Sequence, residues 1–119
     1  NNLSDDINEA VMRSTIRNIR VLLTDHNNYA ARSELAWASA MAENSILKIG
    51  KVTDFQCHIL EHQLGAYTNC NHGAGLAVLH PVLYRHICEA NTARFARFAV
   101  NVWGIDPEAN RGGTGPRRC

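Results

Sequence analysis

The sequence has 119 residues, of which 45% are hydrophobic and 19% are charged, a composition typical of a globular chain with a modest core. Its formal net charge of +1 gives no electrostatic support for nucleic acid or an anionic membrane as a partner. No apolar run approaches the roughly 18 residues of a membrane span, and the first residues lack the basic and apolar segments of a signal peptide. We therefore expect a cytoplasmic chain that binds neither nucleic acid nor membrane.

Apolar residues recur at helical spacing from the start of the chain. Ser4 is expected to cap a first helix, whose early acidic residues would face the positive end of the helix dipole. The polar run 25–28 should end that helix, because its short side chains compete for backbone hydrogen bonds. An alanine-rich second helix is predicted from about Ala30 to Ile49, with Gly50 as its left-handed C-terminal cap.

Three further helices are predicted in the second half of the chain. Thr53 or Asp54 can cap the third helix, and the composition of residues 68–73 predicts the turn that follows it. Pro81 falls in the fourth helical segment, where it either kinks the helix or begins a new one. A fifth helix is predicted over residues 93–103.

The whole pattern predicts an all-α fold. No segment alternates apolar and polar residues as a half-buried strand does, and the sequence contains no internal repeat. We expect a bundle of about five helices that forms one helical domain over residues 1–108. Residues 109–119 are rich in glycine and arginine, cannot bury an apolar face, and are expected to form a disordered tail.

Three of the six histidines predict a metal site. His58 and His62 are four residues apart on a predicted helix, so their rings project from the same face. His72 follows ten residues after His62, just past the turn, where the returning chain can bring it back to that face. Imidazoles gathered in this way suit zinc or ferrous iron. The alternative is that such a pair on an amphipathic helix is only a set of polar surface residues.

The remaining histidines indicate structural or surface roles. His26 and His86 are expected at the surface or at helix ends. His80 directly precedes Pro81 in an apolar stretch, where a hydrogen-bonded structural histidine is the favoured interpretation.

Two segments around the three histidines resemble the iron-containing alcohol dehydrogenase family. That family carries H-x-x-x-H-x-L-x-A and then a third histidine ten residues after the second. The matching residues here are His58-Ile59-Leu60-Glu61-His62-Gln63-Leu64-Gly65-Ala66 and Asn71-His72-Gly73-Ala74-Gly75-Leu76-Ala77. The apolar run into Pro81 and the ending Trp103-Gly104-Ile105 are similar to the family's butanol-dehydrogenase-like branch. The resemblance covers roughly residues 3–108 and implies the C-terminal helical domain of such an enzyme.

The resemblance assigns roles to matching positions. It implies that His58 and His72 ligate the metal, Fe²⁺ or Zn²⁺, and that His62 is a catalytic residue in the cleft beside the nicotinamide of NAD(P). Spacing alone would instead pair His58 with His62 as the chelating residues. In the family, the metal polarises the alcohol or aldehyde oxygen while hydride moves to or from the nicotinamide. Glu61, Asn69 and Asn71 are candidates for hydrogen bonds to the ligating rings.

The sequence also departs from the family pattern. The family has two further metal ligands in a D-x-x-x-H motif on an upstream helix, and a glycine-rich turn that binds the dinucleotide. No D-x-x-x-H occurs before Asn28, where Asp25 and His26 are adjacent, and the glycine-rich turn is absent from these residues. We therefore expect weak metal binding, no catalysis by this chain alone, and self-association through surface that the missing parts would cover.

Two alternatives remain open from the sequence. The chain could be a stand-alone helical module for oligomerisation or interaction, derived from such a domain and without catalysis. It could also be an independent metal-binding bundle that uses His58, His62, His72 and Cys70. The preferred alcohol, the choice between NAD and NADP and the native metal are not encoded in these residues.

Overall fold

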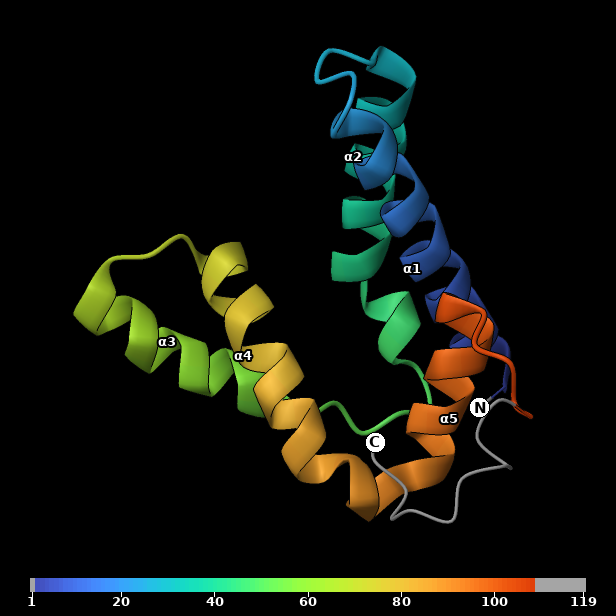
Figure 1. The fold of residues 1–119 in the computed structure, drawn as a ribbon, viewed down its shortest axis with the longest axis vertical. Coiled ribbons are helices and arrows are strands. Elements are labelled where there is room, and N and C mark those ends of the chain that lie inside the picture. The colour runs from blue at the N-terminus through green and yellow to red at the C-terminus, as the bar shows by residue number, and fades with distance from the viewer. Residues whose placement is uncertain (1, 109–119) are drawn as a thin grey trace. The chain divides into compact units, whose positions relative to one another are not determined.

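The computed structural model describes residues 2–108 and is helical throughout (Figure 1). Within this range there are five α-helices, two short 3-10 helices and no strand, which confirms the all-α class and the expected number of helices. None of the described helices combines the length and apolar character needed to cross a bilayer. The tail predicted over 109–119 lies outside the described residues. The elements are α1 (Asn2–Leu22), α2 (Tyr29–Glu43), η1 (Ser45–Lys48), α3 (Gln56–Thr68), α4 (His72–Ile87), η2 (Cys88–Asn91) and α5 (Thr92–Trp103).

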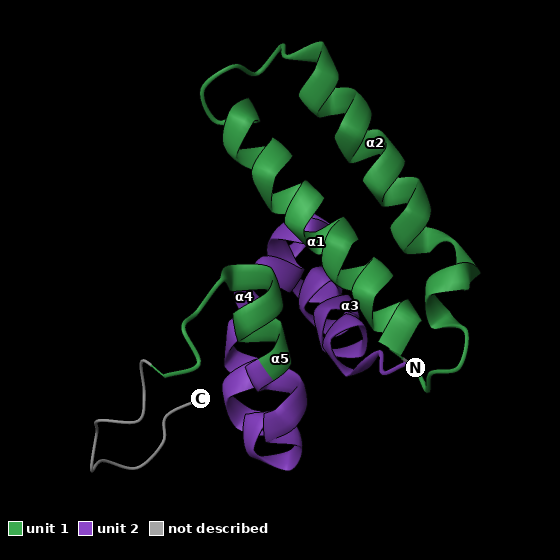
Figure 2. Cartoon of the chain, turned by 90° about the vertical axis from the view of Figure 1, so that its right-hand side faces the viewer, with its two compact units in different colours: residues 1–52, 97–109 green, residues 53–96, 110–119 purple. Residues whose placement is uncertain are grey.

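The described chain divides into two compact units (Figure 2). The first unit contains the residues up to 52 and those from 97 onward, and the second contains residues 53–96. Helix α5 therefore begins in the second unit and ends in the first. The three histidines of the predicted metal site all belong to the second unit, on α3 and α4.

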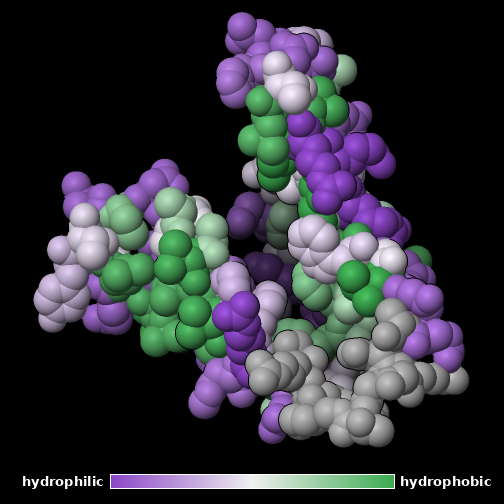
Figure 3. All heavy atoms as spheres, viewed as in Figure 1, coloured by the Kyte–Doolittle hydropathy of each residue, from purple (hydrophilic) through white to green (hydrophobic). Residues whose placement is uncertain are grey.

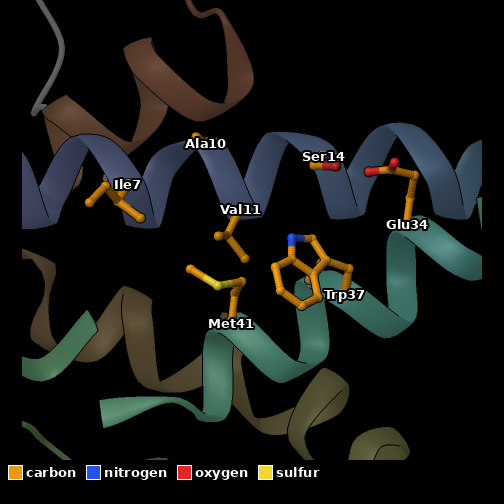
Figure 4. Close-up of a pocket in the computed structure, with 8 residues that line it drawn as sticks. Ile7, Ala10, Val11, Ser14, Glu34, Trp37 and Met41 are labelled. Carbon is orange, nitrogen blue, oxygen red and sulfur yellow. The ribbon is translucent and has the colours of Figure 1, made fainter. Parts of the chain in front are cut away.

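The first unit is built around the pairing of α1 with α2 (Figure 4). Ile7 and Val11 of α1 point toward Trp37 and Met41 of α2. Ala38 lies between the helices and is 7% exposed, so its small side chain permits their close approach. Together with their neighbours these residues line a groove of about 290 Å³. The apolar stripe predicted along the first helix therefore faces α2 in part, but it does not fill the space between the two helices.

The start of α1 differs from the prediction. The helix begins at Asn2, so Ser4 lies in its first turn and not at the cap position. The Ser4 side chain is buried, and its hydroxyl donates a hydrogen bond to the carbonyl oxygen of Leu47 at 3.1 Å. The prediction that Ser4 caps the helix was wrong, because its hydroxyl binds a carbonyl oxygen 43 residues away in sequence.

The second helix ends earlier than the predicted boundary at Ile49. Helix α2 stops at Glu43, and the side-chain oxygen of Asn44 accepts a hydrogen bond from the backbone N–H of Ile46 at 3.1 Å. That bond begins the 3-10 helix η1, which replaces the last turn of the predicted helix. Gly50 has a φ of 72°, the left-handed conformation that the sequence predicted for it.

A polar network joins α1 to the second half of α5 within the first unit. Arg97 donates hydrogen bonds to Glu9 and, at 2.6 Å, to Asp6. Asn101 adds a hydrogen bond of 3.0 Å to the second carboxylate oxygen of Glu9. Arg97 lowers the pKa of Glu9 through its hydrogen bond, an effect that burial opposes and Asn101 reinforces. The sequence predicted that the early acidic residues of α1 would face the helix dipole. In the structure, Asp6 and Glu9 also bind side chains far away in sequence.

A short turn joins α3 to α4 in the second unit. Asn69 adopts a left-handed conformation with a φ of 53°, and its N–H bonds the carbonyl oxygen of Gly65 at 2.8 Å to close α3. Asn71 then caps α4, because its side-chain oxygen accepts from the N–H of Ala74 at 3.3 Å. Two asparagines therefore reverse the chain, and the predicted turn over 68–73 is confirmed.

Helix α4 continues through Pro81. The hypothesis that Pro81 begins a new helix was therefore wrong. A ring nitrogen of His80, one residue earlier, lies 3.0 Å from the carbonyl oxygen of Leu76, and the His80 ring packs against Tyr84 with centroids 5.2 Å apart. The expectation of a hydrogen-bonded structural histidine at position 80 is confirmed.

The ion pair of Glu9 should make the stability of the chain depend on pH. A carboxyl whose folded-state pKa is lowered stabilises the fold above its ordinary pKa, about 4.3, and loses that contribution as pH falls through the lowered value. We expect Glu9→Gln to lower the melting temperature at pH 7, and the difference from the parent chain to shrink toward about pH 3. Thermal unfolding followed by circular dichroism measures both.

Glu43→Gln is the matched control, because it removes the same charge from an exposed position at the end of α2. Its melting temperature should stay near that of the parent chain at every pH. An equal loss in both variants would show that net charge, and not the contact with Arg97, sets the effect.

Candidate metal centre

The structure brings His58, His62 and His72 together beside the start of α4. His58 and His62 lie on α3, and His72 is the first residue of α4. The ring centroid of His72 is 5.2 Å from that of His58 and 5.6 Å from that of His62. The centroids of His58 and His62 are 6.5 Å apart. The predicted return of His72 to the face of the third helix is therefore confirmed.

The three rings differ in their exposure to solvent. His58 is half-buried and meets the ring of Phe55 edge-on, with centroids 5.6 Å apart. His62 and His72 are exposed, and the side chain of His72 is 49% accessible. A ligand arriving from solvent can therefore reach His62 and His72 directly, while Phe55 restricts the ring of His58.

Glu61 is a buried acidic residue beside the histidines. It is 2% exposed, and its Oε2 is hydrogen-bonded to Nδ1 of His72. The sequence had nominated Glu61, Asn69 and Asn71 as partners for the ligating rings. Of these, Glu61 makes the contact, while the two asparagines shape the turn.

Two glycines leave space for the Glu61 carboxylate. A Cβ atom at Gly75 of α4 would lie 2.7 Å from Oε1 and 2.8 Å from Cγ of Glu61, closer than real contacts allow. A Cβ atom at Gly65, on the helix of Glu61 itself, would lie 3.3 Å from the same oxygen. The small residues that follow His72 in the sequence therefore let α4 approach α3 over a buried acid.

The possible ligand atoms form a compact set. Among the described residues, Glu61, His62 and His72 offer atoms that all lie within 4.8 Å of one another. Two imidazoles and a carboxylate suit zinc or ferrous iron. This set includes His62 and leaves out His58, so it differs from the ligand pair that the resemblance implied. Cys70 has a free thiol but is not a member of this group.

Tyr84, His86 and His26 are ionisable residues outside the histidine cluster. Tyr84 lies on α4, and burial raises its pKa, with a smaller contribution from Cys57 of α3. His86 is exposed, as is His26 in the first unit. The carbonyl oxygen of His26 accepts a hydrogen bond from Arg32 at 2.7 Å. These positions agree with the surface roles that the sequence predicted for the two histidines.

Comparison with known proteins places this hairpin in a family. Residues 1–114 match the model of the C-terminal region of the Fe-containing alcohol dehydrogenase family. No solved structure matches the chain.

Three curated relatives illustrate the similarity. NADH-dependent butanol dehydrogenase B of Clostridium acetobutylicum is 41% identical over 91% of this chain and 28% of its own length. The corresponding figures for NADH-dependent butanol dehydrogenase A of the same organism are 39%, 87% and 27%. NADPH-dependent aldehyde reductase YqhD of Escherichia coli is 27% identical over 87% of this chain and 27% of its own length.

The chain thus spans little more than a quarter of the length of these relatives, and the part it matches is the helical C-terminal region. The resemblance read from the histidine segments is confirmed, including its butanol-dehydrogenase-like character. This chain belongs to the Fe-containing alcohol dehydrogenase family.

Proposed function

We propose that this chain carries half of the metal site of an NAD(P)-dependent alcohol or aldehyde oxidoreductase of the cytoplasm. The observation that supports the proposal most is the meeting of three imidazoles across the α3–α4 turn, with ring centroids 5.2 to 6.5 Å apart. His58 and His72 would hold the metal, Fe²⁺ or Zn²⁺. His62 would be the catalytic residue beside the reacting carbon.

The metal, when bound, would act as a Lewis acid on the alcohol or aldehyde oxygen. The side chains of this chain supply the remaining functions. His62 is exposed and 5.6 Å from His72 by ring centroids, so it can reach a substrate bound next to the ligating ring. An imidazole can take up and release a proton near neutral pH, which suits a relay to the substrate oxygen.

The site in this chain is incomplete. Two histidines give a metal two protein ligands, whereas metal sites of this kind keep three or four. Hydride transfer also needs a bound dinucleotide, and these 119 residues contain no glycine-rich phosphate turn. We therefore propose that the chain alone binds metal weakly and does not catalyse the reaction.

Metal titration tests the assignment of the ligands. Calorimetry with ZnCl₂ should show weak binding to the parent chain, and His58→Ala or His72→Ala should weaken it by more than about tenfold, because each removes a donor from the coordination shell. His62→Ala should leave the affinity within about twofold, and His86→Ala is the control at an exposed position outside the cluster.

One result of that titration would overturn the assignment. If His62→Ala weakens zinc binding as strongly as His72→Ala while His58→Ala does not, the ligands are the compact set of Glu61, His62 and His72.

The absence of turnover by the isolated chain is also measurable. The parent chain, loaded with Zn²⁺ or, under argon, with Fe²⁺, is mixed with NADH and butyraldehyde, and absorbance of the dinucleotide is followed. We expect the rate of the buffer blank, because the glycine-rich phosphate turn that binds a dinucleotide is not found in these residues. A rate that scales with protein concentration and falls in His62→Ala would refute the proposed incompleteness.

A second candidate function is self-association, and exposed apolar surface favours it. Figure 3 shows apolar side chains gathered over the α3–α4 hairpin. Several large apolar residues of these two helices are exposed, namely Ile59, Leu60, Tyr67, Val78 and Val82. Contiguous apolar surface of this kind marks an interaction site in soluble proteins.

We infer that this surface joins two copies of the chain when no other domain covers it. Sedimentation equilibrium should show a homo-oligomer, and a Val78→Lys/Val82→Lys double variant should shift the equilibrium toward monomer, because the lysines place charge on the apolar face. Val52→Lys is the control, since Val52 is fully exposed and lies outside the hairpin. A monomeric parent chain at all concentrations would refute the inference.

A further inference from the structure

Glu61 is the acid that the proposed chemistry leaves without a role. It sits on α3 between His58 and His62, is 2% exposed, and contacts the first residue of α4. We propose that Glu61 is a positioning residue that holds His72 as the tautomer protonated on Nδ1, so that Nε2 is the nitrogen that faces a metal. The inference rests on the proposed function only in naming the metal as the ligand of Nε2.

The contact between Nδ1 of His72 and Oε2 of Glu61 is the observation behind this assignment. If the carboxylate accepts in that contact, the proton is on Nδ1 of the imidazole. A neutral imidazole carries one N–H, which leaves the lone pair on Nε2. Ligating histidines in metalloproteins are commonly oriented by such a partner on the other ring nitrogen.

The packing around Glu61 holds the carboxylate in place. The backbone of Gly75 lies against it from α4, where a Cβ atom would overlap Oε1 and Cγ at 2.7 and 2.8 Å. Gly65 leaves space on the α3 side, where a Cβ atom would come within 3.3 Å of Oε1. Gly75 is itself buried, so this side of the carboxylate is closed to solvent.

Direct ligation of a metal by Glu61 is the competing interpretation. The three grouped ligand atoms are close enough for it, at 4.8 Å or less. Two observations favour the positioning role. The Glu61 side chain is 3% exposed, whereas that of His72 is 49% exposed. In addition, Oε2 is already engaged by Nδ1 of His72, so a metal at that oxygen would have to displace the hydrogen bond.

The tautomer of His72 can be measured in the metal-free chain. Long-range ¹H–¹⁵N spectra at pH 8 separate protonated from unprotonated ring nitrogens, and His72→Gln identifies the signals. We expect a protonated Nδ1 and an unprotonated Nε2 on His72 in the parent chain. Glu61→Ala, and Gly75→Ala by displacing the carboxylate, should both convert His72 to a mixture of tautomers.

Zinc affinity provides the second readout. Because partners of ligating histidines are worth about 10- to 100-fold in metal affinity, Glu61→Ala and Gly75→Ala should weaken zinc binding by that factor without abolishing it. Gly73→Ala is the matched control on the same helix, since a Cβ atom there would meet only Asn71 Oδ1 at 3.4 Å, an ordinary contact. It should change neither the tautomer nor the affinity.

The outcomes separate this inference from the proposed function. Protonation of His72 on Nε2 in the parent chain would overturn the positioning role, whatever zinc does. The same holds if Glu61→Ala weakens zinc binding as much as His72→Ala while the tautomer of His72 stays unchanged, which would make Glu61 a direct ligand. Protonation on Nδ1 with no zinc binding by the parent chain would support the role of Glu61 and refute the metal site. If Glu61→Ala loses helical circular dichroism, Glu61→Gln preserves the volume and is expected to redistribute the tautomers in the same way.

Discussion

The reversal of the chain between α3 and α4 is the constraint on which the candidate site depends. Two histidines on one helix face cannot form a site with a third unless the next helix begins beside them. Asn69 ends α3 in a left-handed conformation, and Asn71 caps α4 immediately afterwards, so His72 becomes the first residue of the returning helix. The hydrogen bond between Glu61 and His72 then ties the two helices at the same point. The turn and a part-buried hydrogen bond thus both fix the position of His72.

The buried carboxylate of Glu61 accounts for the residue types that pack against it. A carboxylate removed from water needs a hydrogen-bonding partner, because an unpaired buried polar group is costly. His72 provides that partner, and Gly75 provides the space. The small residues after the third histidine are therefore explained by packing against Glu61, in addition to the role of the histidine itself. The histidine segments and the glycines beside them form one structural unit.

The first unit shows the same reliance on long-range polar contacts. Asp5 pairs with Lys51 at 2.6 Å, Glu9 pairs with Arg97, and the Ser4 hydroxyl binds the carbonyl oxygen of Leu47. All three polar residues lie on α1 and are buried. In contrast, many large apolar residues of both units remain exposed. The matched relatives are more than three times as long as this chain.

The sequence by itself determined the helical class, the number of helices, the turn at 68–73 and the three histidines, because helical periodicity, asparagine-rich turns and residue spacing are local properties. It also identified the family, because the spacing of four and then ten residues is specific. Only the structure decided that Ser4 is not a cap and that the second helix ends at Glu43. It also selected Glu61, and not Asn69 or Asn71, as the partner of His72. The Ser4 contact joins residues 43 positions apart, and the Glu61 contact joins residues 11 positions apart. These residues become neighbours only in the folded chain, so local sequence patterns do not reveal their pairing.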